Sequence, residues 1–288
     1  MQSSSSAVTA PRMQWRRRVA IYGRLPVAIR WVLLLAMLIG LWQAYIQWKH
    51  PNPLQFVTPA DTARAFVDGW QDGSLASATQ ATLRLLGIGM AIGTGMAILL
   101  TAFATFTRVG DDLLGLLTAM INPLPGVAIL PLALLWFGLN ERAIIFVIAN
   151  AVTWPIAINL STGFKTVNPT IVAVARNVGL KGVRLVTDVL APAALPHAVS
   201  GLRTAWAFGW RTIVAAELVF GVAGDKGGLG WLLNDARFNL ETERVFAALV
   251  NIMLIGIALD IVFLLVERWT VVRWGMKTAR RSLLVPPG

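Results

Sequence analysis

The sequence predicts an all-α integral membrane protein with about six transmembrane helices. Hydrophobic residues make up 56% of its 288 residues, and charged residues make up only 14%. Apolar runs long enough to cross a bilayer recur along the chain, and polar or basic segments separate them. A soluble protein of this length would carry more charge and shorter apolar runs, so the composition excludes a soluble globular protein.

The first four expected spans carry no charged residue. They are Trp31–Trp48, Leu85–Thr107, Leu113–Asn140 and Ala143–Phe164. Within the second, Gly89 and Gly93 form a small-residue pattern that allows two helices to approach closely. Each stretch is near the length that a membrane helix requires, so these four spans are predicted from length and apolarity alone.

The last two expected spans contain ionisable residues. The fifth lies between residue 196 and Gly224, and Arg203, Arg211 and Glu217 interrupt it. The sixth, Val245–Val266, contains Asp260. The chain therefore divides into a basic N-terminal tail (1–30), a membrane domain (31–267) and a C-terminal tail (268–288).

Loop charges orient these spans, because Lys and Arg tend to stay on the cytoplasmic side. With both termini in the cytoplasm, 16 of the 25 Lys and Arg residues lie inside, six lie outside, and three lie within a span or, like Arg84, directly beside one. The net charge of +11 is then explained by membrane orientation, and it gives no reason to expect a nucleic-acid partner. The polar, basic start of the chain lacks a small-residue cleavage pattern, so it is interpreted as a cytoplasmic tail.

The cytoplasmic loop between the fourth and fifth spans, residues 165–196, is predicted to form an ordered elbow of two short helices. Asn168 is expected to cap the first helix, and Gly179 is expected to end it in a left-handed conformation. The second helix covers about Lys181–Leu190 and is expected to run into Pro192 and Pro196. This elbow is too polar to span a bilayer, so it is predicted to be a docking surface.

Two outer segments are candidates for a partner contact or a gate. Thr58–Asp61 resembles a capping box, and an apolar stripe follows it, which indicates a short helix on the membrane surface or against a partner. The stripe consists of Ala63, Phe66, Val67 and Trp70. The glycine-rich segment Gly221–Gly230 has no preceding strand and no Gly-Lys-Ser/Thr, so it is interpreted as a mobile or re-entrant gate segment rather than a nucleotide site. The contact candidates are Phe66, Trp70 and Asp225, and the gate candidates are Gly228 and Gly230.

Candidates for a solute pathway lie within spans three and five. Three prolines interrupt span three, which indicates either a kinked packing helix or a helix that lines a pathway. They are Pro123, Pro125 and Pro131. Ionisable residues within a span are functional candidates. Arg211 and Glu217 either pair with polar groups on neighbouring spans, such as Asp260, or Arg211 faces the pathway and attracts an anion.

The residue inventory argues against an enzyme or a metal site. The chain contains no cysteine and only two histidines, which excludes disulfides, thiolate metal sites and histidine clusters. Asp111-Asp112 is not an aspartate-rich diphosphate motif, and no nucleophile and base stand together in the sequence. We therefore expect no metal and no catalytic residues.

Several motifs resemble those of the permeases of binding-protein-dependent ABC importers. Gly179 followed by Val189, Leu190, Ala191 and Pro192 matches the Gly-x9-Ile-x-Leu-Pro half of their cytoplasmic signature. The Glu-Ala-Ala that opens this signature reads Ala173, Val174 and Ala175 here, so its glutamate is absent. Other motifs are similar to the branch that imports nitrate, sulfonate and taurine. They are Pro123-Leu124-Pro125, Trp136-Phe137-Gly138, Gly201-Leu202-Arg203, Trp210-Arg211 and Gly228-Leu229-Gly230.

This resemblance implies a non-catalytic permease subunit of an ATP-driven importer in the bacterial cytoplasmic (inner) membrane. It would move a small organic anion from the periplasm to the cytoplasm. The implied partners are a second permease copy in a homodimer, two cytoplasmic ABC ATPase subunits that hold ATP and Mg, and a periplasmic binding protein. The chain itself would bind no cofactor. The alternative is an ion-coupled secondary transporter of a small anion, although no inverted repeat with paired broken helices is visible.

In such a permease the elbow would dock the ATPase. The residues implied for this coupling are Ala173, Val174, Ala175, Arg176, Gly179, Lys181, Val189 and Pro192. Because the signature glutamate is missing, we expect docking to depend on shape and apolar contact, with Arg176, Lys181 and Arg184 at the rim.

Overall fold

The computed structural model describes residues 26–221 and 227–272. The chain divides into two units, residues 1–52 with 281–288 and residues 53–280. The first unit contains helix α2 (Val27–Lys49), which has membrane length and no buried residue. The expected span Trp31–Trp48 is therefore confirmed as a helix. The second unit contains all the other described elements.

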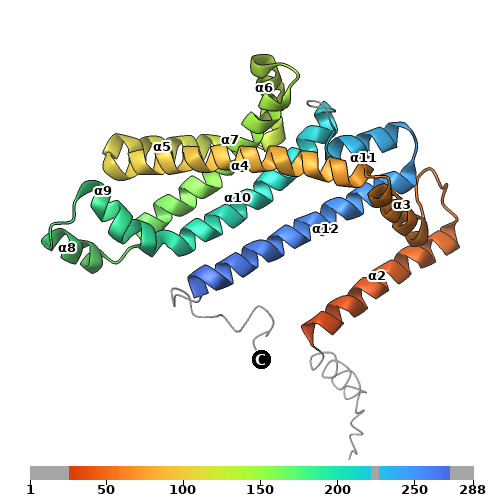
Figure 1. Cartoon of the computed structure of the whole chain (residues 1–288), viewed down its shortest axis with the longest axis horizontal. Coiled ribbons are helices and arrows are strands. Elements are labelled where there is room, and N and C mark those ends of the chain that lie inside the picture. Colours follow the sequence, from red (N-terminus) through yellow and green to blue (C-terminus); the bar gives the residue numbers. More distant parts are fainter. Residues whose placement is uncertain (1–25, 222–226, 273–288) are drawn as a thin grey trace, which may run out of the picture. The chain divides into compact units, whose positions relative to one another are not determined.

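All regular elements in the described part of the second unit are helices, which confirms the predicted all-α class (Figure 1). Its elements are α3 (Pro59–Gln71), α4 (Ser74–Phe106), α5 (Arg108–Ile121), η1 (Gly126–Ile129), α6 (Leu130–Phe137), α7 (Glu141–Lys165), α8 (Pro169–Asn177), α9 (Gly182–Leu185), η2 (Val186–Leu190), α10 (Ala191–Phe220), α11 (Leu229–Phe238), α12 (Thr242–Glu267) and η3 (Arg268–Val272). With α2, the described part of the chain has five helices that are long and apolar enough to cross a membrane. The number rises to six if the bent pair formed by α5 and by η1 with α6 is counted as one span.

The core of this unit lies where α4, α7 and α10 pack together. Apolar side chains from all three helices fill it, including Leu86, Ile148 and Ile213, none of which is more than 1% exposed. The two glycines of α4 face α7, as their spacing predicted. A Cβ on Gly93 would lie 2.7 Å from the carbonyl oxygen of Ala149. Only glycine therefore lets these two helices approach so closely.

Span three differs from the single kinked helix that Leu113–Asn140 predicted. Helix α5 ends at Ile121, and α6, which follows η1, turns away at an angle of 94° (Figure 1). Pro123 and Pro125 lie in the break, where their missing N–H groups prevent helical hydrogen bonds. Pro131 lies in the first turn of α6, a position at which the missing N–H costs nothing. Two of the three prolines break the span, and the third begins the next helix.

The elbow differs from its prediction at Pro192. The second elbow helix does not end there but continues through η2 into α10, so that one helix runs from Gly182 to Phe220. The segment η2 is a π-helix, in which the Ala191 N–H donates to the Val186 carbonyl oxygen five residues earlier. This wider turn accommodates Pro192 without a helix break, because the usual i→i−4 ladder is already displaced.

The segment before α4 forms the predicted helix. The Thr58 side chain accepts the Asp61 N–H at 3.1 Å, as a capping box requires. Helix α3 packs against α12 and α4 through Thr62, Phe66 and Gly69, whereas Trp70 remains 44% exposed. Ala63, Val67 and Trp70 of the predicted stripe are exposed in the single chain, and Phe66 is half-buried, so contact of this stripe with the membrane or a partner stays a prediction.

Within the glycine-rich segment Gly221–Gly230, the last two residues, Leu229 and Gly230, begin helix α11. Helix α11 packs against α10, α12 and α4. Gly228 and Gly230 are buried, whereas Asp225 lies outside the described residues. Gly228 and Gly230 are thus packed against the neighbouring helices, and their role as a gate stays a prediction.

Candidate functional site

The elbow presents an apolar surface at the end where α7 leads into α8 and α9 leads into α10. Asn168 accepts the Thr170 N–H through its side chain at 2.9 Å, and Gly179 has φ +89°, so both predicted helix limits are confirmed. The exposed large apolar residues of α8, α9 and the turn between them are Ile171, Val174, Val178 and Val183. Such a surface is unusual for a segment too polar to enter the bilayer, and it indicates a protein partner.

The predicted coupling residues do not all lie on this surface. Ala173, Val174, Arg176, Gly179, Lys181 and Pro192 are exposed, and Val189 is half-buried. Ala175 is buried instead, and its carbonyl oxygen accepts the Leu180 N–H at 3.0 Å. Ala175 therefore packs the inside of the elbow. Arg176, Lys181 and Arg184 are exposed, and their side chains form no ion pair with any described residue.

A second cluster surrounds Glu217, whose side chain is buried near the outer end of α10. Its carboxylate accepts the Thr82 hydroxyl at 2.9 Å and the Gly230 N–H at 3.0 Å. The Thr82 oxygen in turn accepts the Leu229 N–H at 2.8 Å. Only 1% of Glu217 is exposed, so these bonds form in a water-poor environment. The cluster connects three helices, α4, α10 and the first residues of α11.

The ion pairs of the long helices differ from those expected. Asp260 pairs with Arg203, through contacts of 3.0 Å to Nε and 3.1 Å to Nη2, and not with Arg211 or Glu217. Glu267 lies 3.9 Å from the same guanidinium. Arg203 therefore connects α10 to α12. Arg211 is exposed and makes no hydrogen bond or ion pair with any described residue. These two arginines of one helix thus have different environments.

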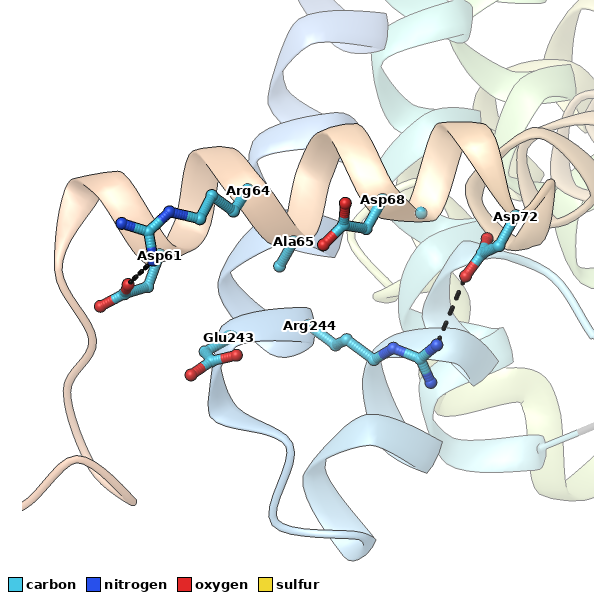
Figure 2. Close-up of a pocket in the computed structure, with 8 residues that line it drawn as sticks. Asp61, Arg64, Ala65, Asp68, Asp72, Glu243 and Arg244 are labelled. Carbon is cyan, nitrogen blue, oxygen red and sulfur yellow. Dashed lines mark hydrogen bonds and ion pairs between the residues drawn. The ribbon is translucent and has the colours of Figure 1, made fainter.

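Sequence reasoning missed a charged pocket. It has a volume of about 310 Å³ and lies between α3 and the start of α12 (Figure 2). Its charged lining residues are Asp61, Arg64, Asp68, Asp72, Glu243 and Arg244. Each is an ordinary surface residue in sequence. Only the packing of α3 against α12 brings them together, so no sequence signal could have identified them.

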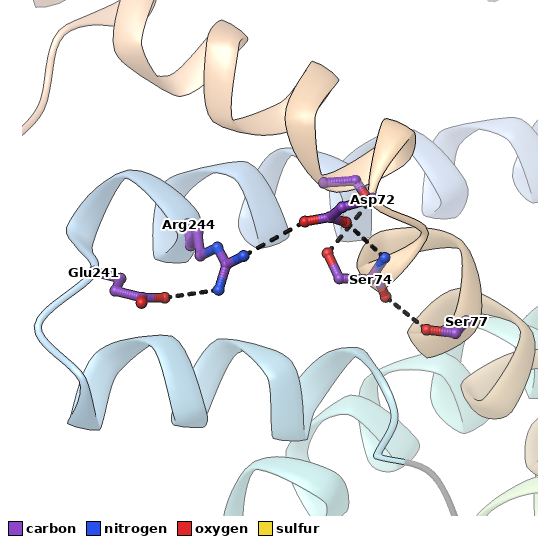
Figure 3. A network of polar contacts seen from close by, with 6 residues as sticks. Asp72, Ser74, Ser77, Glu241 and Arg244 are labelled. Atoms are coloured by element: carbon purple, nitrogen blue, oxygen red, sulfur yellow. Dashed lines mark hydrogen bonds and ion pairs between the residues drawn. The ribbon is translucent and has the colours of Figure 1, made fainter.

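A polar network closes one end of this pocket (Figure 3). Arg244 contacts Asp72 at 3.4 Å and Glu241 at 3.0 Å. The Ser74 N–H donates to Asp72 at 2.8 Å, and the Ser74 hydroxyl donates to the Gly69 carbonyl oxygen. The nearby Ser74 side chain, its N–H and Arg244 lower the pKa of the Asp72 carboxyl group. Asp72 therefore stays ionised at a pH at which it would already be protonated in the unfolded chain. The stability that it contributes is fully present above its unfolded pKa and is lost as the pH falls through the lowered pKa.

The second unit combines a broken span, an elbow with an apolar surface and a short helix, α11, packed against the long helices. The model of the family described as "Binding-protein-dependent transport system inner membrane component" matches residues 89–272. The chain belongs to this family. It is the permease component of an ABC importer and an inner membrane protein, and the secondary-transporter alternative is not favoured. The matched range contains the broken span, the elbow and the Glu217 side chain.

Curated relatives cover almost the whole permease. The Escherichia coli aliphatic sulfonates transport permease protein SsuC is 34% identical over 93% of this chain and 96% of its own. The E. coli taurine transport system permease protein TauC is 27% identical over 87% of this chain and 90% of its own. The Synechocystis nitrate import permease protein NrtB is 28% identical over 90% of this chain and 94% of its own.

A solved structure supports the fold of the permease independently. A crystal structure of an amino acid ABC transporter with histidines superposes with a TM-score of 0.58 at 18% identity. It covers 72% of this chain and 98% of its own chain. At this identity the likeness concerns the arrangement of the helices alone.

Proposed function

We propose that this permease carries a small organic anion of the sulfonate class through the membrane in an importer driven by a separate ATPase. The observation that carries the proposal is the elbow: an exposed apolar surface with a basic rim, continuous with the two helices α7 and α10 of the core. The substrate class is supported by three relatives named for sulfonates, taurine and nitrate, all of them small molecules with an anionic group.

In the proposed importer, each elbow sits in a groove on one of two cytoplasmic ATPase subunits. Val174, Val178 and Val183 would supply the apolar contact, and the three basic rim residues would face acidic groups of the ATPase. ATP and Mg would be held by the ATPase, and the permease would transmit its movement. With alanine at position 173, shape and apolar contact replace the salt bridge that a glutamate there would make.

The proposed partners on the other faces are a periplasmic binding protein and a second permease copy. Trp70 and the exposed side of α3 offer the binding protein an aromatic contact beside the charged pocket, and Phe66 supports that helix from inside. Asp225, a further contact candidate, lies outside the described residues. A homodimer would cover helix faces that the single chain leaves open.

Transport by the reconstituted importer tests this proposal. Proteoliposomes containing the permease and its ATPase should take up ethanesulfonate, taurine or nitrate only with ATP on the ATPase side and the binding protein on the other. Uptake is measured with labelled solute, and vesicles without ATP serve as the control. Uptake that requires an ion gradient and no ATP would overturn the proposal, as would uptake of nitrate alone or of none of the three solutes.

The proposed orientation places the elbow and both termini in the cytoplasm. Since the natural chain contains no cysteine, single cysteines can be introduced without background. Asn168→Cys in the elbow and Phe238→Cys at the end of α11 replace exposed residues. A membrane-impermeant maleimide applied to intact spheroplasts is expected to label Phe238→Cys and to label Asn168→Cys only after lysis. Labelling of both from the same side would contradict this orientation.

A further inference from the structure

One side of α10 is left uncovered by the rest of the chain. The exposed residues Thr204, Phe208, Arg211 and Leu218 follow one another at intervals of four, three and seven residues. At 3.6 residues per turn this spacing places all four on one side of the helix. We call this side the open face of α10.

Packing fixes the direction of the open face. The opposite side of α10 is buried through residues that face α4, α7 and α12. They include Ala205, Trp206, Gly209, Ile213 and Ala216. A Cβ on Gly209 would lie 3.0 Å from Leu86 and 3.1 Å from Val152. The helix cannot rotate about its axis without losing these contacts, so Arg211 stays on the open face.

Arg211 is the charged residue of α10 that makes no hydrogen bond or ion pair with any described residue. Arg203 on the same helix has both Asp260 and Glu267, and the Glu217 carboxylate is occupied by Thr82 and Gly230. Arg211 lies nine residues before Phe220, or about 14 Å below the outer end of the helix. An unpaired guanidinium at this depth is very unfavourable against lipid tails, so the open face must border water or another protein.

The break in span three lies at the same depth. Gly126, the first residue of η1, is in contact with α10: a Cβ there would lie 2.7 Å from the Thr212 side chain. The four residues before it are exposed and non-helical, and the Asn122 amide makes no side-chain hydrogen bond to any described residue. Irregular backbone at membrane depth is tolerated only where it is covered by protein or borders a water-filled cavity. Two independent features thus indicate a polar environment at one level.

We propose that the open face lines a water-filled pathway between two copies of the permease, and that Arg211 of each copy binds the anionic group of the solute there. This inference rests on the proposed function and extends it to a selective site in the membrane. A guanidinium donates two parallel N–H bonds to two oxygens of a sulfonate, nitrate or carboxylate group. With no described acid on the open face, the two arginines give the pathway a positive potential that favours anions over cations.

The reactivity of a single cysteine beside Arg211 tests this site without any transport measurement. Phe208→Cys lies on the open face one turn from Arg211, and the chain has no other cysteine. In membranes that contain the assembled importer, we compare a methanethiosulfonate reagent that carries a sulfonate with one that carries trimethylammonium. The anionic reagent is expected to react faster, and Arg211→Gln in the same background should lower the anion-to-cation rate ratio by about fivefold or more. Arg211→Lys should retain most of it.

A matched control distinguishes a pathway from general exposure. Ile257→Cys, on an exposed apolar part of α12, is expected to face lipid and to react with neither reagent. Absence of reaction at Phe208→Cys, or an unchanged rate ratio in Arg211→Gln, would overturn the inference. Failure of the proposed function would be recognised differently, because the wild-type importer would then transport none of the anions tested, whatever the labelling ratio.

Discussion

Replacement of Glu217 by alanine is expected to destabilise the permease by about 3 kcal/mol or more and to release the start of α11. The carboxylate accepts bonds from Thr82 and Gly230, and both donors are buried. Alanine would leave them without a partner, and each unsatisfied buried polar group costs about 1–3 kcal/mol. It would also leave a cavity at a site where only 1% of the residue is exposed.

The measurement is the thermal midpoint of the purified permease in detergent, together with protease sensitivity of the segment before α11. Glu217→Gln should be much milder, because its amide oxygen can still accept one of the two bonds. Glu243→Ala provides the matched control, since Glu243 is an exposed glutamate without an ion pair to any described residue. An equal midpoint for the Glu217→Ala and Glu243→Ala variants would show that the cluster contributes little.

Replacement of Gly179 by valine is expected to lower uptake at least tenfold while the amount of permease in the membrane is unchanged. The reason is conformational, because a Cβ at Gly179 would meet no atom within 4 Å but the residue has φ +89°. A β-branched residue in that region carries strain on the order of 1–3 kcal/mol, and the exposed elbow can relieve it by changing shape. The fit to the ATPase would then be lost although the membrane helices remain intact.

Simultaneous assays of uptake and ATP hydrolysis in proteoliposomes distinguish this uncoupling from misfolding. Gly179→Asn should be tolerated better, because asparagine enters the left-handed region more readily than valine. Gly115→Val is the matched control: it lies within α5, and a Cβ there also meets no atom within 4 Å, but its backbone is helical. Normal coupled transport by Gly179→Val would argue against the elbow as the docking surface.

The sequence predicted best the features that depend on a few neighbouring residues. The caps at Thr58 and Asn168 each require one side chain and the backbone within three residues of it. The left-handed turn at Gly179 requires only a residue without a side chain. The membrane helices were predicted from apolar length in the same way. Local chemistry was sufficient because each of these features is stabilised mainly by contacts within its own segment.

The sequence failed where distant segments decide the outcome. Arg203 and Asp260 are 57 residues apart, and nothing local distinguishes Arg203, which is paired, from Arg211, which is exposed. The second elbow helix was expected to end near Leu190, but a π-helical turn accommodates Pro192. The charged pocket exists only because α3 packs against α12. In each case tertiary packing selected among several locally acceptable arrangements.

The continuous helix from Gly182 to Phe220 has a mechanical consequence. Its 39 residues extend over about 58 Å, so one unbranched rod connects the elbow with Arg211 and Glu217. Its π-helical turn and its two prolines all lie between Val186 and Pro196, near the elbow end. Bending is therefore concentrated there, and the remaining length is stiff. A tilt of the stiff part of the helix would therefore displace Arg211 and Glu217, which is bonded to the start of α11, together.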